Sequence, residues 1–564
     1  MKKQIITGAA LSMMLIWSSC SKDFLNRIPE DKVTTDNFWN TQTDATNALN
    51  AVYGQLGDGG AGIASLMDGQ NAIYEDGASD NALAQYPWES NATVIALGNI
   101  TPINDDGFDF QGIRKANALL ENIDKVKGMS ADLNKRCKAE ARALRAFYFI
   151  SLVLRFGDVP LVTNTTMGNL PRDPKDKVVK FIYDELDAAA ADLPESYSGG
   201  YPNEKGRITK GAALALAARM HLYQSDYAGA LKYAKAVMDI PGYSLFKVAA
   251  EDATDAADNY KIWVDFADNT EEKKFRLGLR SYEQLFWAAN KGNAEVIFDR
   301  QHVFQKDPQS ENTYLLPSNF GGWSSVTPTQ ELVDAYASFK TGDPLTTTID
   351  AATRGDRYKV RDNGNIQPSF YTEFRNRDPR FYATVMFDST RWNRLGGATT
   401  FKWRKGGSNN SKTGYNFRKL VDPAAYPDYD NWSNHIIIRY AEILLTYAEA
   451  KNEISGPDGS VYDAIDQIRE RAGMPKLDRA KYAGQAALRE AIRHERRIEL
   501  VLEGNRYMDI RRWKTAPAVM NRKVYAIDGT EADTRVWSDR LYLLPVPQSA
   551  IDKNAKLLPN NNGY

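Results

Sequence analysis

The sequence predicts an all-α fold: a scaffold of tetratricopeptide-like helix pairs that is interrupted by long irregular insertions. Three paired stretches carry this prediction, namely residues 135–149 with 178–186, 212–223 with 227–239, and 439–450 with 461–469. In each pair the first stretch has alanine where a partner helix must approach closely, and the second supplies Tyr, Val or Ile to fill the gap. Tetratricopeptide hairpins use this arrangement, because each hairpin buries its faces only by stacking on its neighbours.

The helix pairs are unevenly spaced, because two irregular segments separate them. Residues 57–104 and, more extensively, 240–435 lose helical periodicity and gain Gly, Asn, Pro and aromatic residues. The larger segment holds six of the eleven tryptophans: Trp263, Trp287, Trp323, Trp392, Trp403 and Trp432. Disordered chains avoid tryptophan, and long irregular segments of compact proteins commonly carry function. We therefore expect helix pairs within 41–240 and 436–515 to support two insertions that pack side by side.

The first 19 residues have the three parts of an export signal. Two lysines are followed by an apolar run at 5–17 and by small residues that precede Cys20. The run is too short to span a bilayer stably. The small-small-Cys ending resembles a bacterial lipobox, in which a diacylglycerol is attached to the cysteine thiol and the signal is cut just before it. We expect a lipid-anchored single domain of residues 20–564; the alternative is an ordinary signal peptide with an incidental cysteine at position 20.

Composition is that of an ordinary folded protein, with 43% hydrophobic and 25% charged residues. The 71 Lys and Arg residues nearly balance the 72 Asp and Glu residues, so no net field favours nucleic acid or an anionic membrane, and neutral ligands fit better. With Cys20 acylated, Cys137 is the one remaining thiol and has no disulfide partner. Cys137 lies in an apolar helical stripe, which predicts a buried structural thiol.

Several sequence blocks occur in the order that is typical of one known family. They are DFLNRIPED at 23–31, FWNTQTDA at 38–45, RFGDVPL at 155–161, NAEVIF at 293–298, PTQELVDAY at 328–336, RDPR at 377–380, TGYNFRK at 413–419, IRYAEILLTYAEA at 438–450, RHERRIEL at 493–500, GNRYMDIRRW at 504–513 and LPVPQSAID at 544–552. Together these blocks resemble the SusD/RagB family of outer-membrane nutrient-binding lipoproteins of Bacteroidetes. The resemblance covers essentially the whole of residues 20–564.

This resemblance implies about four tetratricopeptide-like helix pairs with an irregular ligand-binding region. It also implies a SusC-like TonB-dependent transporter as partner, which imports what the lipoprotein captures. Most characterised relatives bind glycans, whereas the RagB branch is associated with peptides, and the quoted blocks do not choose between these ligands. Ser21, Lys22 and Asp23 after the cysteine resemble the charged tether that directs some Bacteroidetes lipoproteins to the cell surface. The expected location is therefore the outer membrane, lipid-anchored and exposed at the cell surface.

Aromatic side chains in the insertions are the candidate ligand contacts. The C–H face of a neutral sugar stacks on an indole, while nearby amides and carboxylates bond its hydroxyl groups. The candidates are Trp88, Asn91, Trp287, Trp323, Trp392 and Tyr74. Trp88 and Asn91 offer a stacking plane and an amide close together, and the glycines before Trp323 would let that ring protrude. For each tryptophan the alternative is a partly buried packing role.

We expect no catalytic residues. Paired carboxylates are what a glycosidase needs, and the best acidic series is Glu495, Glu499 and Glu503. Residues four apart lie on one helix face, whereas a glycosidase pair must flank a bond from two sides of a cleft, so we expect no convergent pair there. Ion pairs between helices are the expected use of these acids, with the arginines nearby in the sequence: Arg493, Arg496, Arg497, Arg506, Arg511 and Arg512.

Neither a metal nor a cofactor is expected. The four histidines (His221, His302, His435 and His494) show no zinc-site spacing, and there is no nucleophile elbow and no P-loop. The acids Asp68, Glu75, Asp76 and Asp80 match no calcium loop. The leading hypothesis is capture of an oligosaccharide for delivery to a transporter. The alternatives are capture of peptides by the same fold and a surface polysaccharide hydrolase.

Overall fold

The computed structural model describes residues 38–57, 69–166, 168–197, 199, 204–362, 364–395, 399–427 and 431–564. The expected signal peptide, Cys20 and Asp68 lie outside the described residues. No helix within the described ranges is long and apolar enough to cross a membrane.

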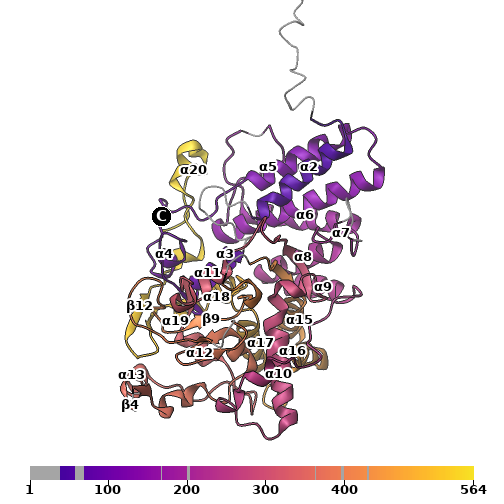
Figure 1. Cartoon of the computed structure of the whole chain (residues 1–564). Helices are drawn as coiled ribbons and strands as arrows, with labels where there is room; N and C mark the ends of the chain where they lie inside the picture. The colour runs from indigo at the N-terminus through magenta and orange to yellow at the C-terminus, as the bar shows by residue number, and fades with distance from the viewer. Residues whose placement is uncertain are drawn as a thin grey trace, which may run out of the picture.

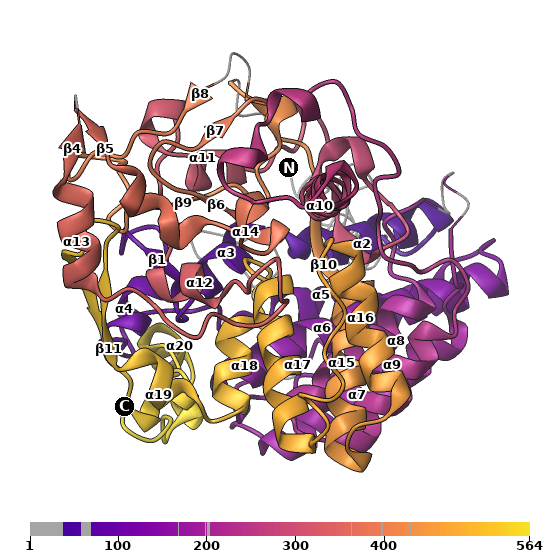
Figure 2. The same cartoon turned by 90° about the horizontal axis from the view of Figure 1, so that it is seen from below.

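A continuous array of stacked helices forms one side of the molecule (Figures 1 and 2). Each helix of the array packs on the next one, and the last three pack on one another. The array consists of α2 (Gln42–Tyr53), α5 (Gln111–Asn122), α6 (Ala131–Phe156), α7 (Lys175–Asp192), α8 (Lys210–Tyr223), α9 (Tyr227–Met238), α15 (Tyr440–Ser455), α16 (Gly459–Arg471) and α17 (Gln485–Glu499). The three predicted pairs are α6 with α7, α8 with α9 and α15 with α16, and all three are confirmed. Helices α2 and α5 add a fourth pair.

Local sequence explains where these helices begin and which faces they bury. The side chain of Thr209 accepts a hydrogen bond from the Ala212 amide at the start of α8, and Asp226 does the same for the Gly229 amide of α9. Helix α8 buries five alanines and packs on both α7 and α9. Cys137 is buried between α2, α5 and α6, and burial raises the pKa of its thiol to about 11. The predicted structural role of Cys137 is confirmed.

The larger insertion leaves the array after α9 and returns at α15, yet α9 packs directly on α15. The insertion contains α10 (Asn269–Glu283), α11 (Glu311–Leu315), α12 (Gln330–Ala335), α13 (Ala351–Lys359) and α14 (Pro379–Thr384). The expectation that helical periodicity fades throughout this segment is wrong for α10. Asp268 caps α10, and Phe275, Leu279 and Tyr282 form its buried face.

Short antiparallel strand pairs fasten the irregular segments. The pairs in the described ranges are β1 (Ala82–Ala84) with β3 (Val326–Pro328), β2 (Val296–Arg300) with β10 (His435–Arg439), β4 (Arg361–Asp362) with β5 (Asn365–Ile366), β6 (Val385–Met386) with β9 (Asn416–Phe417), β7 (Arg391–Trp392) with β8 (Thr399–Thr400), and β11 (Arg522–Tyr525) with β12 (Glu531–Arg535). Strand β1 belongs to the first insertion and β3 to the second, so the two insertions lie side by side, as predicted.

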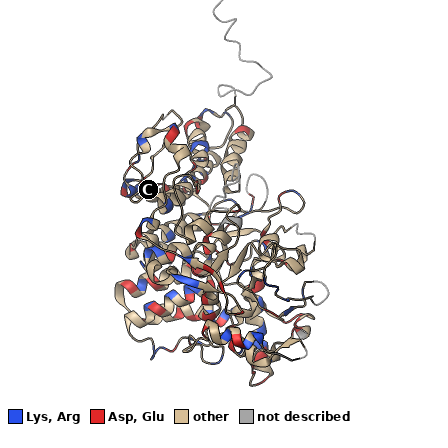
Figure 3. Ribbon diagram, turned by 90° about the vertical axis from the view of Figure 1, so that its left-hand side faces the viewer, with Lys and Arg blue, Asp and Glu red and all other residues tan. Residues whose placement is uncertain are grey.

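The first insertion also contains regular structure that the sequence did not reveal. Its short helices are α3 (Gly69–Gly77) and α4 (Ala92–Ala96). The C-terminal part adds α18 (Arg506–Arg512), α19 (Ala516–Met520) and α20 (Gln548–Lys553). Basic and acidic residues are interspersed over the ribbon in Figure 3, in keeping with the balanced composition.

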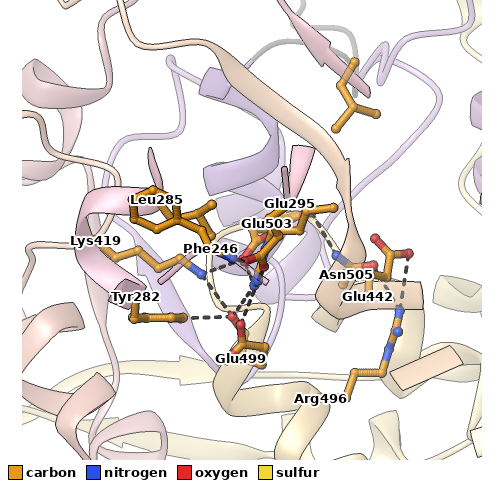
Figure 4. A network of polar contacts seen from close by, with 12 residues as sticks. Phe246, Tyr282, Leu285, Glu295, Lys419, Glu442, Arg496, Glu499, Glu503 and Asn505 are labelled. Carbon is orange, nitrogen blue, oxygen red and sulfur yellow. Dashed lines mark hydrogen bonds and ion pairs between the residues drawn. The ribbon is translucent and has the colours of Figure 1, made fainter. Parts of the chain in front are cut away.

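A buried ion-pair network joins the array to the larger insertion (Figure 4). The Glu499 carboxylate at the end of α17 lies 2.8 Å from Arg380 of α14 and 2.7 Å from Arg439 of β10, and it also pairs with Arg471 of α16. Glu499 and its three arginine partners are all nearly inaccessible to solvent. These arginines hold the pKa of the Glu499 carboxyl well below its usual value, against the opposing effect of burial.

The neighbouring acids follow the same pattern. Glu495 pairs with Arg380 and Arg469, and Glu503 pairs with Arg439 and Lys419. The predicted structural use of the acidic series is therefore confirmed, but the predicted partners are wrong. The arginines close in sequence bind other acids, as Arg496 binds Asp509 and Arg512 binds Glu449.

Replacing Glu499 by Gln is expected to lower the free energy of unfolding by about 3–5 kcal/mol, because three arginines lose a buried counter-charge. Urea denaturation measures the loss. The matched control is Glu490→Gln on the same helix, whose side chain is 72% exposed and which should change stability by less than about 0.5 kcal/mol.

The same substitution should also change the pH dependence. A carboxylate with a lowered pKa stabilises the fold above its unfolded-state pKa, and this stabilisation is lost as pH falls. Below about pH 5 the unfolding free energy of Glu499→Gln should therefore depend less on pH than that of the parent protein. Equal stabilities of the Glu499 and Glu490 variants would contradict a supporting role for the network.

Candidate functional site

A surface cavity of about 230 Å³ lies where the first insertion meets the end of α6. We call it the Trp88 pocket. It is lined by Tyr74, Glu75, Ala78, Pro87, Trp88, Glu89, Ser90, Asn91, Ala92, Ile95, Ile103, Asn104, Asp105, Asp106 and Arg155. Three of the six predicted site residues, Tyr74, Trp88 and Asn91, thus line one pocket.

Strand β1 fixes the segment that carries Trp88. The Gln85 amide, directly after β1, donates to the Ser325 carbonyl at 2.8 Å, so the chain leaves the strand at a defined point. The chain then turns, with the Glu89 amide donating to the Tyr86 carbonyl at 3.2 Å, before α4 begins. The turn presents Trp88 to solvent, and 78% of this residue is exposed.

Trp88 stacks on Tyr86, with ring centroids 4.9 Å apart and planes at 27°. The Tyr86 hydroxyl oxygen accepts a hydrogen bond from the Asn409 amide at 3.0 Å and lies 3.5 Å from the Trp323 carbonyl oxygen. Tyr86 therefore connects Trp88 of the first insertion to two loops of the second. We call Tyr86, Trp88 and Trp323 the aromatic platform.

Trp323 is 40% exposed, and its edge meets the Tyr314 ring at a centroid distance of 5.5 Å. The predicted role of the adjacent glycines is confirmed. Gly321 has φ +79°, and a Cβ on Gly322 would lie 2.1 Å from the Leu316 carbonyl oxygen. Only glycine allows the loop to fold back closely enough to place the indole at the surface.

Two predicted tryptophans pack against neighbouring segments. Trp392 is only 2% exposed, with the Arg418 guanidinium 4.5 Å from its ring centroid, so its prediction as a ligand contact is wrong. Trp287 is partly buried against the core, and its indole N–H donates to the Val421 carbonyl at 3.1 Å. Both rings belong to the same insertion as Trp323, but only Trp392 is covered; the prediction of Trp287 as a ligand contact stays a prediction.

Tyr74 and Asn91 form part of the wall of the Trp88 pocket. Tyr74 is 3% exposed and donates its hydroxyl to Glu89 at 2.5 Å, so it positions Glu89 and offers no open stacking face. Burial, followed by the Glu89 charge, raises the pKa of the Tyr74 hydroxyl. The Asn91 amide donates to the Asp105 carbonyl at 2.7 Å and to Asp106 at 3.1 Å.

Four carboxylates line the Trp88 pocket: Glu75, Glu89, Asp105 and Asp106. The prediction that no two carboxylates converge on a bond in a cleft stays a prediction, because lining one pocket does not place two acids on either side of a bond. Arg155, from the end of α6, pairs with both Glu75 and Asp106. Burial raises the pKa of both Glu75 and Glu89. The four acids lie in one stretch of the chain, residues 75–106, and the fold brings Arg155 of α6 to them.

No group of three or more His, Cys, Asp or Glu side chains in the described part of the chain could hold a metal ion. The histidines serve the fold. The His221 ring stacks on Tyr183 with centroids 3.8 Å apart, and His494 bonds the Ala335 carbonyl at 2.7 Å. Burial lowers the pKa of His302 to about 4 and that of His435 to about 3.

Sequence reasoning did not identify Tyr86 or the pocket acids as part of the site. The two aromatic residues Tyr86 and Trp88, close together in the turn that follows β1, are a usable signal. Glu89 is next to Trp88 in the chain. No local pattern joins Glu75, Asp106 and Arg155.

Two family models match the chain. The model described as "SusD family" matches residues 283–564, and the model described as "Starch-binding associating with outer membrane" matches residues 23–222. The chain belongs to the SusD family. The resemblance of the sequence blocks and the predicted all-α fold are both confirmed.

Named members of the SusD family match along nearly the whole chain. The SusD-like protein P2 of Formosa agariphila is 24% identical over 94% of this chain and 90% of its own length. The starch-binding protein SusD of Bacteroides thetaiotaomicron is 23% identical over 100% of this chain and 99% of its own length.

Solved structures of the SusD family share the fold. A SusD-like protein of Bacteroides fragilis has a TM-score of 0.75 at 28% identity, covering 95% of this chain and 100% of that one. A SusD-like carbohydrate binding protein of the same species has a TM-score of 0.74 at 27% identity, covering 92% and 99%.

Removing an exposed ring of the platform should leave stability nearly unchanged. We expect Trp88→Ala and Trp323→Ala to change the free energy of unfolding by less than about 1 kcal/mol, whereas Trp392→Ala should cost about 3–5 kcal/mol. Chemical denaturation of the three variants measures the difference. A loss for Trp88→Ala as large as that for Trp392→Ala would mean that Trp88 is a packing residue.

Proposed function

We propose that this protein is a lipid-anchored, surface-exposed lipoprotein of the outer membrane that binds oligosaccharides. It then delivers them to a SusC-like TonB-dependent transporter without making or breaking a covalent bond. The observation that carries this proposal is the exposed Trp88 indole, held by Tyr86 beside a polar pocket.

The aromatic platform suits a sugar ring on physical grounds. The axial C–H groups of a pyranose form an apolar face that stacks on an indole, and the hydroxyls around its edge need acceptors. The carboxylates of Glu89 and Asp105 lie in the pocket next to Trp88. The Tyr86 side chain is already held in place, because its hydroxyl accepts a hydrogen bond from the Asn409 amide. Little side-chain conformational entropy of Tyr86 is therefore lost when a ligand binds.

The relatives support the same ligand class. One match is named a starch-binding protein, one solved structure is described as a carbohydrate binding protein, and one family model is described as associating with the outer membrane. Capture of peptides remains the first alternative, because the scaffold is compatible with either ligand.

The pocket acids favour a second alternative, hydrolysis of a polysaccharide. Glu89 is a half-buried carboxyl whose pKa is raised by burial, which is a property of catalytic acids. These acids also have structural contacts. Glu89 accepts a hydrogen bond from the Tyr74 hydroxyl, and Glu75 and Asp106 both pair with Arg155. We therefore assign them to ligand binding and test the alternative directly.

Trp88→Ala should weaken oligosaccharide binding at least about fivefold, because a stacked ring contributes about 0.5–1.5 kcal/mol beyond the area it buries. Soluble protein lacking residues 1–20 is screened on a glycan array, with a peptide library beside it, and the strongest ligands are titrated by calorimetry. The matched control is Ile454→Ala, which removes an exposed apolar side chain from α15 and should leave binding unchanged.

The same experiment separates the alternatives. Tight peptides and no bound glycan would support peptide capture. Cleavage products that disappear with Glu89→Gln would support a hydrolase. Glycan binding that is indifferent to Trp88→Ala would place the site elsewhere.

Cys20→Ser should release the protein from membranes without affecting its fold, because two or three acyl chains, at about 0.8 kcal/mol per buried methylene, supply the anchor. Detergent phase partitioning and protease accessibility of intact cells measure the change. Membrane retention of the Cys20→Ser protein would contradict lipid anchoring at this cysteine.

A further inference from the structure

The lining of the Trp88 pocket has more acidic than basic side chains, and this imbalance bears on which sugars it can take. Its lining contains four carboxylates and one basic group, the Arg155 guanidinium. The inference below rests on the proposed function, since it concerns the ligand of the same pocket.

Several donors of the pocket are occupied by the pocket itself. Arg155 is held by Glu75 and Asp106, and also donates to the Asp106 carbonyl at 2.8 Å. The Asn91 amide donates to Asp105 and Asp106, and the Asn104 amide lies 3.4 Å from the Asn91 oxygen that accepts from it. The one cation of the lining is therefore already engaged by two carboxylates, and an anionic ligand group finds no second cation there.

The acids of the lining outnumber its one basic group. Arg155 balances one charge of the Glu75 and Asp106 pair, and the lining holds no second cation. Glu89 receives a hydrogen bond from the neutral Tyr74 hydroxyl, and Asp105 receives backbone hydrogen bonds from Gly107 and Phe108 at 3.0 and 3.1 Å. None of these three partners carries a neutralising charge, so the pocket is locally acidic although the whole chain is nearly neutral.

We propose that the Trp88 pocket selects sugars that carry a protonated amine, such as hexosamine units, and disfavours sugars that carry carboxylate or sulfate groups. An ammonium group brings three donors and a positive charge to the acceptors of Glu89 and Asp105. It also gains from the exposed face of Trp88, because cations are attracted to an indole ring. An anionic group would be repelled and would leave the acceptors without donors.

Oligosaccharides with one backbone and different substituents test the charge preference. The probes are tetramers of β-1,4-linked glucose, glucosamine, N-acetylglucosamine and glucuronic acid, titrated by calorimetry at low and physiological salt. We expect the glucosamine tetramer to bind roughly three- to tenfold more tightly than the glucose tetramer, and the glucuronic acid tetramer to bind more weakly than either. The preference should shrink as salt screens the charges.

Charge-removing variants locate the effect. Glu89→Gln with Asp105→Asn keeps the side-chain shapes and the hydrogen bonds to Tyr74 and to the Gly107 amide, and should bring the glucosamine preference to within about twofold. The control is Glu490→Gln on helix α17. It removes one negative charge, as each substitution of the double variant does, and should leave the glucosamine preference unchanged.

A second measurement needs no bound sugar. Quenching of tryptophan fluorescence by caesium and by iodide, at constant ionic strength, is compared between the parent protein and Trp88→Phe, and the difference reports on Trp88. The quenching constant of each ion is divided by its value for free N-acetyltryptophanamide, because iodide is intrinsically the stronger quencher. On this relative scale we expect caesium to quench the Trp88 share more than iodide, and the order to reverse or level in the double variant. Stronger relative quenching by iodide in the parent protein overturns the proposal whatever sugars bind.

The outcomes separate this proposal from the proposed function. Binding that depends on Trp88 but shows no preference for the amine overturns the charge selection and leaves glycan capture standing. Binding of lysine-containing peptides in preference to every tetramer overturns both. Failure of every glycan on the array to bind overturns glycan capture, and amine selection with it.

Discussion

The structure depends on the Glu499 carboxylate and the three buried arginines that surround it. Glu499 ends α17, and its partners come from the insertion helix α14, from the strand that leads into α15 and from α16. A buried carboxylate without counter-charges is strongly unfavourable, so these segments are stable only when they assemble together. The network thereby ties the repetitive helical array to the larger insertion, whose Trp323 and Asn409 segments contact Tyr86 of the aromatic platform.

Much of the array could be predicted because its information is local. Alanine and aromatic residues at helical spacing identify the pairs α6 with α7, α8 with α9 and α15 with α16 in the sequence. Helix α10 carries a comparable signal, with Phe275, Leu279 and Tyr282 on one face behind an Asp268 cap. The Gly, Pro and Trp residues around it mask this signal in the sequence.

The candidate site could be predicted only in part. Trp323 follows two glycines that allow the loop to place its indole at the surface. This pattern is local, so the sequence can reveal it. No comparable local pattern accompanies Trp392. Its burial depends on tertiary packing with Arg418, which follows β9 in the chain. The acidic character of the Trp88 pocket was hidden in a chain of balanced charge, because Glu75, Asp106 and Arg155 meet only after folding.

The direct packing of α9 on α15 means that the array is complete without the segment that separates them in sequence. A different connecting segment is therefore compatible with the same packing of α9 on α15. Arg380 limits this freedom, because a replacement that lacked it would leave Glu495 and Glu499 in the interior without one of their counter-ions. Lys419 and Glu295 of the same segment pair with Glu503 and Arg439, so a replacement would have to keep several buried charges in place.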